Sequence, residues 1–217
     1  MDKFIIIGAG GHAAEIDEYL AHANILAGDE KYAVCGFLDD NAESYDAYSF
    51  SAPFLGSIKE HKIDDSCFYI MGIANLKYRK LITEDFKYKG AAFKTFIHPL
   101  AYISPSAKIG EGVVIAPYVN VGPNVVIGDY TLINSRASMG HDTVIGKYNF
   151  ISPNVCFSGF TTIGDENLFG INSASIPQIK IGDRNKIAAG MVVERNIDND
   201  TTYFHRFKEK VLAIPKP

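Results

Sequence analysis

Residues 109–133 read IGEGVVIAPYVNVGPNVVIGDYTLI, and in this stretch a large apolar residue returns at every sixth position. The same period extends from Ile103 to Val193, and Ser175 is the one member of the series that is not large and apolar. An α-helix repeats every 3.6 residues and a strand every two, so neither explains a period of six. Such a period is typical of a parallel solenoid with three short flat faces in each coil. We therefore predict a β-helix over residues 103–193, with the apolar residues stacked inward.

The residue that follows the apolar position is small in most repeats, as at Gly110, Gly128 and Gly146. Because a small residue suits a tight turn, we expect these glycines to form the corners of the coil. The exception at Ser175 predicts a local bulge in the coil. Residues 195–217 leave the pattern and predict a loop, then a short apolar segment that covers the open end of the solenoid.

The first part of the chain has a different character, and we expect two domains, at residues 1–98 and 99–217. The continuous apolar run in residues 4–7 is typical of a parallel strand that is buried on both faces. Strands and helices then alternate, which predicts a small parallel α/β domain. Strands are expected at 3–8, 33–38, 68–73 and 93–97, and helices at 12–23 and 77–85.

The composition excludes several classes of protein. Hydrophobic residues make up 47% of the chain and charged residues 21%, as in an ordinary globular protein. A net charge of −4 argues against nucleic acid as a partner, because surfaces that bind nucleic acid are basic. No apolar run approaches the roughly 18 residues of a membrane-spanning helix, so membrane insertion is not expected. Three scattered cysteines without a CxxC pair indicate a reduced, cytoplasmic protein.

The first candidate site is the segment Gly8–His12, which reads GAGGH after the first expected strand. Glycines there let backbone N–H groups approach a phosphate, although they also suit a plain strand–helix turn. Asp39 and Asp40 end the second strand, where an acidic residue meets a ribose hydroxyl in nucleotide-binding domains; an exposed turn is the alternative. Asn75 and Arg79 follow the third strand, and Arg79 is expected to pair with a phosphate or with a surface carboxylate. The small size of the domain favours a mononucleotide-sized ligand.

The second candidate is His141, the only histidine within the repeats. It occupies the third place of its repeat and is therefore expected to point outward near a corner. An outward histidine can act as a general base, or it can be an ordinary surface residue. Asp142 or Asn134 would orient the imidazole, within one chain or across a subunit boundary. This histidine and Cys156 cannot supply the three or four ligands of a zinc site, so no metal is expected.

Three segments together resemble the bacterial sugar acyltransferase family: FIIIGAGGHAAE at 4–15, FLDD at 37–40 and INSRASMGHDTVIG at 133–146. That family includes sialic acid O-acetyltransferases and N-acetyltransferases of nucleotide-linked 4-amino-sugars. The resemblance covers roughly residues 3–195. It implies a Rossmann-like domain followed by a left-handed β-helix, in a homotrimer that binds acetyl-CoA and a nucleotide-sugar. N-acetylation of a nucleotide-linked 4-amino-deoxysugar is the expected reaction; O-acetylation of a sugar or sialic acid, and nucleotide-sugar binding without catalysis, are the alternatives.

The resemblance also implies roles for individual residues. The catalytic set is His141, Asp142 and Asn134. The nucleotide-sugar side comprises Gly8, Gly10, Gly11, His12, Asp39, Asp40, Asn75 and Arg79, and the cofactor side comprises Phe150, Gly159, Ile171 and Ala189. Phe150 stands where some relatives carry a second active-site histidine, and Ala74 replaces a usual glycine. The ending FHRFKEKVLAIPKP departs from the family pattern, so no contacts to the CoA adenine are carried over to it.

Overall fold

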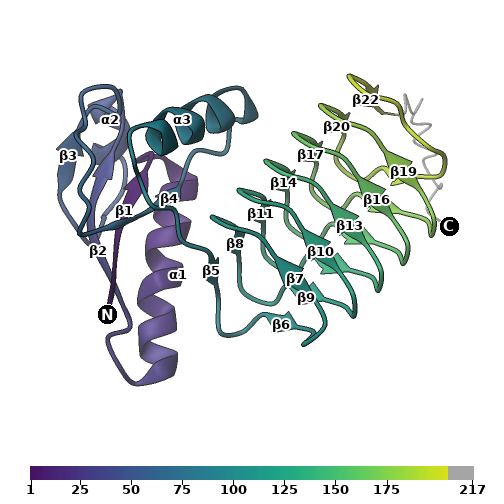
Figure 1. Cartoon of the computed structure of the whole chain (residues 1–217), viewed down its shortest axis with the longest axis horizontal. Helices are drawn as coiled ribbons and strands as arrows, with labels where there is room; N and C mark the ends of the chain where they lie inside the picture. The colour runs from purple at the N-terminus through teal and green to yellow at the C-terminus, as the bar shows by residue number, and fades with distance from the viewer. Residues whose placement is uncertain (205–217) are drawn as a thin grey trace, which may run out of the picture.

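The structure is a computed structural model, and it describes residues 1–204. A small α/β domain leads directly into a long β-helix (Figure 1). The expected Rossmann-like domain and left-handed β-helix are both confirmed. The expected cover of the open end falls mostly on residues 205–217, which lie outside the described residues. In the described part, no helix is long and apolar enough to cross a membrane.

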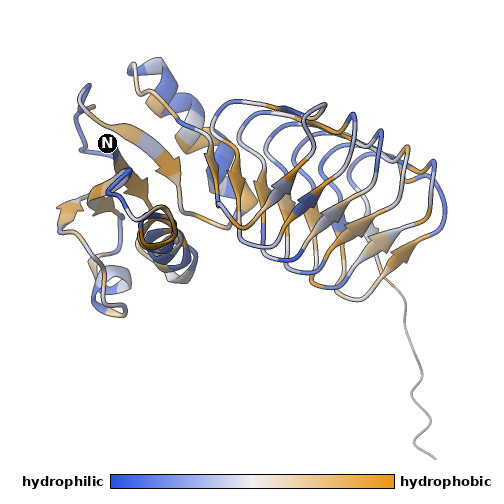
Figure 2. Cartoon of the chain, turned by 90° about the horizontal axis from the view of Figure 1, so that it is seen from below, coloured by the Kyte–Doolittle hydropathy of each residue, from blue (hydrophilic) through white to orange (hydrophobic). Residues whose placement is uncertain are grey.

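The N-terminal domain is built on a four-stranded parallel sheet in the order β3-β2-β1-β4. Its helices cover both faces, so β1 is buried on both sides: Phe4 and Ile6 face α1, whereas Ile5 and Ile7 face α3. This explains the continuous apolar run, which Figure 2 shows as largely hydrophobic strands. β3 and α2 were not expected from the sequence. The elements are β1 (Asp2–Ile7), α1 (Gly11–Ala27), β2 (Tyr32–Leu38), α2 (Ala42–Asp46), β3 (Phe54–Gly56), β4 (Phe68–Met71) and α3 (Leu76–Tyr88).

The expected strand at 93–97 is wrong as a single element of this domain. Phe93 forms an isolated bridge with Tyr69 beside β4. Phe96–Ile97 (β5) pairs instead with β8 and forms the first rung of the β-helix. The chain therefore passes from one domain to the other inside this short segment.

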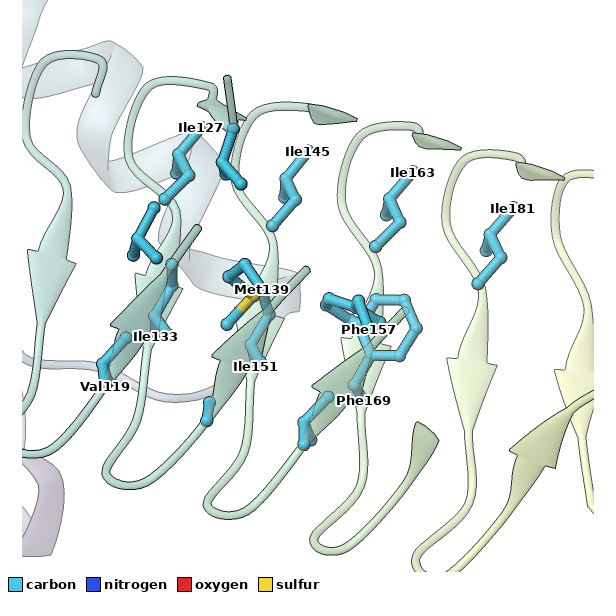
Figure 3. Close-up of a cluster of buried hydrophobic side chains, with 14 of the residues drawn as sticks. Val119, Ile127, Ile133, Met139, Ile145, Ile151, Phe157, Ile163, Phe169 and Ile181 are labelled. Atoms are coloured by element: carbon cyan, nitrogen blue, oxygen red, sulfur yellow. The ribbon is translucent and has the colours of Figure 1, made fainter. Parts of the chain in front are cut away.

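The β-helix consists of two-residue strands in three parallel sheets. Strands one coil apart pair in register, so that Ile133 lies on Ile151. The second residue of each strand points inward, and Ile127, Ile145, Ile163 and Ile181 form one such row (Figure 3). One sheet contains β7 (Lys108–Ile109), β10 (Val126–Ile127), β13 (Val144–Ile145), β16 (Thr162–Ile163) and β19 (Lys180–Ile181). A second contains β5, β8 (Val114–Ile115), β11 (Leu132–Ile133), β14 (Phe150–Ile151), β17 (Leu168–Phe169), β20 (Lys186–Ile187) and β22 (Thr202–Tyr203). The third contains β6 (Tyr102–Ile103), β9 (Asn120–Val121), β12 (Ser138–Met139), β15 (Cys156–Phe157), β18 (Ala174–Ser175) and β21 (Val192–Val193).

The bulge expected at Ser175 is absent, because Ser175 pairs in register with Phe157 and Val193. Its small side chain lies beneath Phe157, whose ring packs against Phe169 with centroids 4.8 Å apart. Its hydroxyl lies 2.9 Å from that of Thr161, so the buried oxygen has a hydrogen-bond partner. A serine therefore fits here because two phenylalanines fill the neighbouring volume.

The corners of the coil differ from the expectation that glycines form the tight turns. The left-handed backbone conformation occurs two residues after those glycines, and mostly on residues with side chains. The N–H of all but one of these residues with side chains donates to a backbone carbonyl of the preceding coil, as Asp142 does to Pro123 at 2.9 Å; the exception is Asn124, whose N–H donates to Oγ of Ser106. This bond holds a conformation that L-residues otherwise avoid. The left-handed residues with side chains in the coils are Tyr118, Asn124, Tyr130, Arg136, Asp142, Tyr148, Asn154, Phe160, Glu166, Asn172, Gln178 and Arg184.

The glycines are needed instead because successive coils lie very close together. A Cβ atom on Gly128 would lie 2.6 Å from the carbonyl carbon of Gly146 in the next coil. Replacing Gly128 by alanine is therefore expected to lower the free energy of unfolding by about 1–3 kcal/mol. Denaturant unfolding measures this loss, and Thr162→Ala, at an exposed position on β16, is the control that should change stability by less than about 0.5 kcal/mol. Equal stability of Gly128→Ala and the wild type would contradict this explanation of the glycines.

Two histidines connect α1 to the first coil. His98 is fully buried, and its Nδ1 accepts a hydrogen bond from the N–H of Leu100 at 3.1 Å. Its Nε2 lies 3.2 Å from Nδ1 of His22 on α1. Burial, together with the neighbouring His22, lowers the pKa of His98 below 6.5. The imidazole of His98, buried at the junction between the two domains, is thus neutral.

Acid is therefore expected to weaken this junction. Because the pKa of His98 is lower in the folded state, the unfolded chain binds the proton first, and stability is lost as the pH falls below about 6.5. The unfolding midpoint should fall more steeply with pH in the wild type than in His98→Asn, whose amide oxygen can still accept from Leu100. His12 and His61, whose pKa values are also lowered, contribute to both curves. Parallel curves would rule out His98 as the source of the difference.

Candidate active site

His141 lies at the corner between β12 and β13 and points outward, with its side chain 58% exposed. Its Nδ1 is 2.8 Å from Oδ2 of Asp142. Because an ionised carboxylate only accepts hydrogen bonds, this contact requires a proton on Nδ1, and the tautomer that provides it leaves Nε2 without one. The hydrogen bonds from His141 and Asn124 lower the pKa of Asp142, which therefore stays ionised near neutral pH. A neutral imidazole held in this way has the nitrogen that a general base requires.

The next coil shapes the space around this imidazole. Gly159 lies against the ring, since a Cβ atom there would be 2.8 Å from Nε2 of His141. Phe160 meets the ring edge-on, with centroids 5.1 Å apart. Within residues 1–204, the backbone N–H groups of Gly159 and Ile171 donate no hydrogen bond. A free N–H beside the imidazole is a donor that can stabilise an oxyanion formed there.

Asn134 and two of the expected cofactor residues, Ile171 and Ala189, lie at another corner of the coil. Asn134 is 6% exposed at the corner between β11 and β12, and its Oδ1 accepts from the N–H of Ser135 at 2.8 Å. Ile171 and Ala189 follow further along the same edge, and the side chain of Ile171 is exposed. Within one chain, the structure therefore pairs His141 with Asp142 and places Asn134 on a different edge.

Most of the expected nucleotide-sugar residues line one cavity beside the carboxyl ends of β1, β2 and β4. Asp39 connects two of its walls, because its Oδ2 accepts from the N–H of Ala9 at 2.8 Å. A Cβ atom on Gly10 would touch nothing within 4 Å, so glycine leaves open space there. Helix α1 begins at this loop without a side-chain cap, and its free N–H groups favour an anion. The lining includes Gly8, Gly10, Gly11, His12, Asp39 and Asn75.

His12 lines this cavity, and its ring packs against Phe150 of β14 in the β-helix. Their rings meet edge-on, with centroids 5.8 Å apart. Nδ1 of His12 lies 3.1 Å from Oε2 of Glu15, while its buried Nε2 has no partner among the described residues. Burial lowers the pKa of His12, so the ring is neutral. Phe150 thus lies at the domain boundary rather than at the corner that holds His141.

Two of the residues expected to bind the nucleotide-sugar do not line the cavity. Arg79 is 2% exposed and donates to the carbonyl oxygens of Ile73, at 2.7 Å, and Tyr130, at 3.2 Å. Both alternatives considered for it are wrong, because backbone carbonyls occupy the place expected for a phosphate or a carboxylate. Arg79 joins α3 to a corner of the β-helix and so supports the loop that lines the cavity. Asp40 accepts from the hydroxyl of Ser57 at 2.7 Å, outside the cavity.

Asn124 belongs to the site but was not expected from the sequence. Nδ2 of Asn124 donates to Oδ1 of Asp142 at 3.0 Å. The signal was present, because Asn124 precedes Asp142 by one coil of the repeat and so lies at the same corner. In residues 1–204, no group of three or more histidine, cysteine, aspartate or glutamate side chains is arranged to hold a metal ion.

A β-helix with a carboxylate-paired histidine at one corner, joined to a domain with a glycine-lined cavity at a helix N-terminus, matches the architecture expected for a sugar acyltransferase. Residues 3–86 match the model of the PglD N-terminal domain. The acetyltransferase domain of PglB from Neisseria gonorrhoeae FA1090, solved in complex with acetyl coenzyme A, is 30% identical with a TM-score of 0.80. The match covers 92% of this chain and 94% of that chain. The chain belongs to this family of bacterial sugar N-acetyltransferases, which are acyltransferases.

Two further relatives are similar over different lengths. UDP-N-acetylbacillosamine N-acetyltransferase of Bacillus subtilis (strain 168) is 29% identical over 117 residues, which are 53% of this chain. The chain thus spans about half of that relative, 51% of its length. PerB from Caulobacter crescentus, solved in complex with CoA and GDP-perosamine, is 24% identical with a TM-score of 0.77 and covers 93% of each chain. This last likeness shows the fold alone.

Proposed function

We propose that the protein transfers the acetyl group of acetyl-CoA to the amino group of a nucleotide-linked 4-amino-deoxysugar, with His141 as the general base. The observation that carries this proposal is the His141–Asp142 contact of 2.8 Å, which leaves Nε2 unprotonated beside Gly159. An attacking amine must lose a proton, and the thioester oxygen becomes an anion during the attack. At this corner, Nε2 of His141 can accept the proton of the amine, and the free N–H of Gly159 can donate to the oxyanion.

In the proposed reaction, the sugar nitrogen attacks the carbonyl carbon of the thioester, and Nε2 of His141 takes the proton from that nitrogen. The N–H of Gly159 donates to the resulting oxyanion, while Asp142 stabilises the imidazolium. Collapse of the intermediate breaks the carbon–sulfur bond, and the departing CoA sulfur receives the proton from His141. The amide and free CoA are the products. Holding both substrates at one corner contributes much of the acceleration through proximity.

We infer that the complete site is shared between neighbouring chains of a homotrimer. The cavity in the N-terminal domain adjoins the sheet that contains β14, through the contact of His12 with Phe150. His141 lies where the other two sheets meet, on the opposite edge of the same prism. A nucleotide-sugar in the cavity would therefore meet His141 of a neighbouring chain. Exposed apolar side chains near the edges supply contact surface for such an assembly, namely Tyr118, Phe160, Ile171 and Ile176.

A single assay tests the reaction and its alternatives. Release of CoA is followed with a thiol dye over UDP-, GDP- and dTDP-linked 4-amino-sugars, together with CMP-linked and free sialic acids. Turnover with at least one nucleotide-linked amino-sugar, and loss of that turnover when the amine is blocked, is the expected result. Turnover with sialic acids alone would point to O-acetylation. Binding of nucleotide without any turnover would point to a scaffold without catalysis.

A further inference from the structure

We propose that Asn124 is a positioning residue for this reaction: its amide holds the Asp142 carboxylate in the orientation that keeps the proton of His141 on Nδ1. The inference rests on the proposed role of His141 as the base and extends it to a third residue. Asn124 would act through Asp142, without touching the substrate.

The geometry of the carboxylate carries the proposal. Each oxygen of Asp142 has one fixed partner: Oδ1 accepts from Nδ2 of Asn124 at 3.0 Å, and Oδ2 lies 2.8 Å from Nδ1 of His141. Rotation of the carboxylate would break one of these contacts. A histidine–aspartate pair as exposed as this one would hold its geometry only weakly on its own, since exposed ion pairs contribute little. The amide therefore supplies the constraint that the pair lacks.

Asn124 is itself held in place by the coil before it. Its backbone N–H donates to Oγ of Ser106 at 2.9 Å, and its φ of 59° is left-handed, which asparagine tolerates better than most residues. Its side chain thereby extends along the β-helix towards Asp142. A continuous path of hydrogen bonds thus leads through three coils, from Ser106 by way of Asn124 and Asp142 to His141.

The chemical type of this side chain matters as much as its place. An amide offers a donor to the ionised carboxylate, whereas a second carboxylate would repel it. When the contact to Asp142 is lost, the neutral imidazole can carry its proton on Nε2, and that nitrogen then cannot accept a proton from the amine. A shift between the two ring tautomers, in a variant that keeps the wild-type unfolding midpoint, is therefore the signature of a positioning role.

Three variants separate this role from a general effect on the fold. Asn124→Gly removes the amide at a position whose left-handed backbone suits glycine, and Asn124→Asp keeps the size but removes the donor. Asp200→Gly is the matched control, because Asp200 is also left-handed (φ 57°) and its side chain also bonds to a neighbouring coil, through Arg184 at 2.7 Å. Asp200 is not part of the site.

The first readout is ¹⁵N NMR of histidine-labelled full-length protein without substrate, with the His141 signals assigned from His141→Gln. Wild type and Asp200→Gly should show the proton of neutral His141 on Nδ1, whereas both Asn124 variants should populate the Nε2-protonated ring. The second readout is turnover with the amino-sugar that releases CoA in the panel. Both Asn124 variants should lower kcat about tenfold, with little change in the KM for acetyl-CoA, and this loss should vanish in an Asp142→Ala background.

The outcomes distinguish this inference from the proposed function. Unchanged tautomer and kcat in both Asn124 variants, with Asp142→Ala still impaired, would overturn the positioning role and leave the base intact. A loss of kcat that persists in the Asp142→Ala background would also overturn it, because the effect would not pass through Asp142. Full activity of His141→Gln would overturn the proposed base itself, while the tautomer measurement would still decide what Asn124 does to the ring.

Discussion

Replacing His141 by glutamine is expected to lower kcat by about 10²–10⁴-fold, the usual contribution of a general base. The side chain is largely exposed, and among residues 1–204 its only polar contact is with the adjacent Asp142, so the fold and the thermal unfolding midpoint should not change. Steady-state release of CoA measures the loss. His61→Gln is the control, because His61 bonds to the hydroxyl of Tyr69 in the N-terminal domain and has no place in the reaction. Activity within a few-fold of wild type would remove His141 from the mechanism.

Replacing Arg79 by alanine is expected to lower the free energy of unfolding by about 2–5 kcal/mol. The change leaves a cavity where a fully buried side chain stood, and it leaves the carbonyl oxygens of Ile73 and Tyr130 without their donor. Burial lowers the pKa of Arg79 to about 10, so the guanidinium is still charged at neutral pH and these bonds are charge-assisted. Denaturant unfolding measures the effect.

Two further variants divide the contribution of Arg79 into packing and hydrogen bonding. Arg79→Met keeps most of the volume and should lose less stability than Arg79→Ala. Arg184→Ala removes an exposed ion pair with Asp200 and should cost less than about 1 kcal/mol. If Arg79→Ala unfolded at the wild-type denaturant concentration, the link between α3 and the β-helix would not be structural.

The period of six predicted the β-helix because each inward side chain repeats with the geometry of the coil. The corners could not be predicted in the same way. Tyr130 and Phe160 adopt a left-handed backbone that their own side chains disfavour, and they do so because a carbonyl of the preceding coil accepts their N–H groups. These hydrogen bonds between coils outweigh the backbone preference of the individual residue. The sequence alone shows only that preference, and it therefore predicted the tight turns at the glycines.

In the candidate site too, contacts between neighbours in the chain could be predicted, whereas contacts between residues far apart in the sequence could not. The contact of His141 with Asp142 followed from adjacency in the chain. The contact of Asn124 with Asp142, by contrast, exists only because successive coils stack on each other. For Arg79, the residue type alone suggested a phosphate partner, whereas its place on α3 beside the buried Thr83 and Phe86 points it into the interior. The residues that line the cavity, such as Gly10, His12 and Asn75, could be predicted from the sequence, because the carboxyl ends of parallel strands lie at one edge of a sheet.

The most direct test of the account is a crystal structure with CoA and the nucleotide-linked 4-amino-sugar that is turned over. We predict that the nucleotide lies over Gly10 and Gly11 of one chain, with the sugar nitrogen within hydrogen-bond distance of Nε2 of His141 from a neighbouring chain. The thioester end of CoA should lie beside the N–H of Gly159. An amino group bound away from every His141 in the assembly would contradict the proposed mechanism.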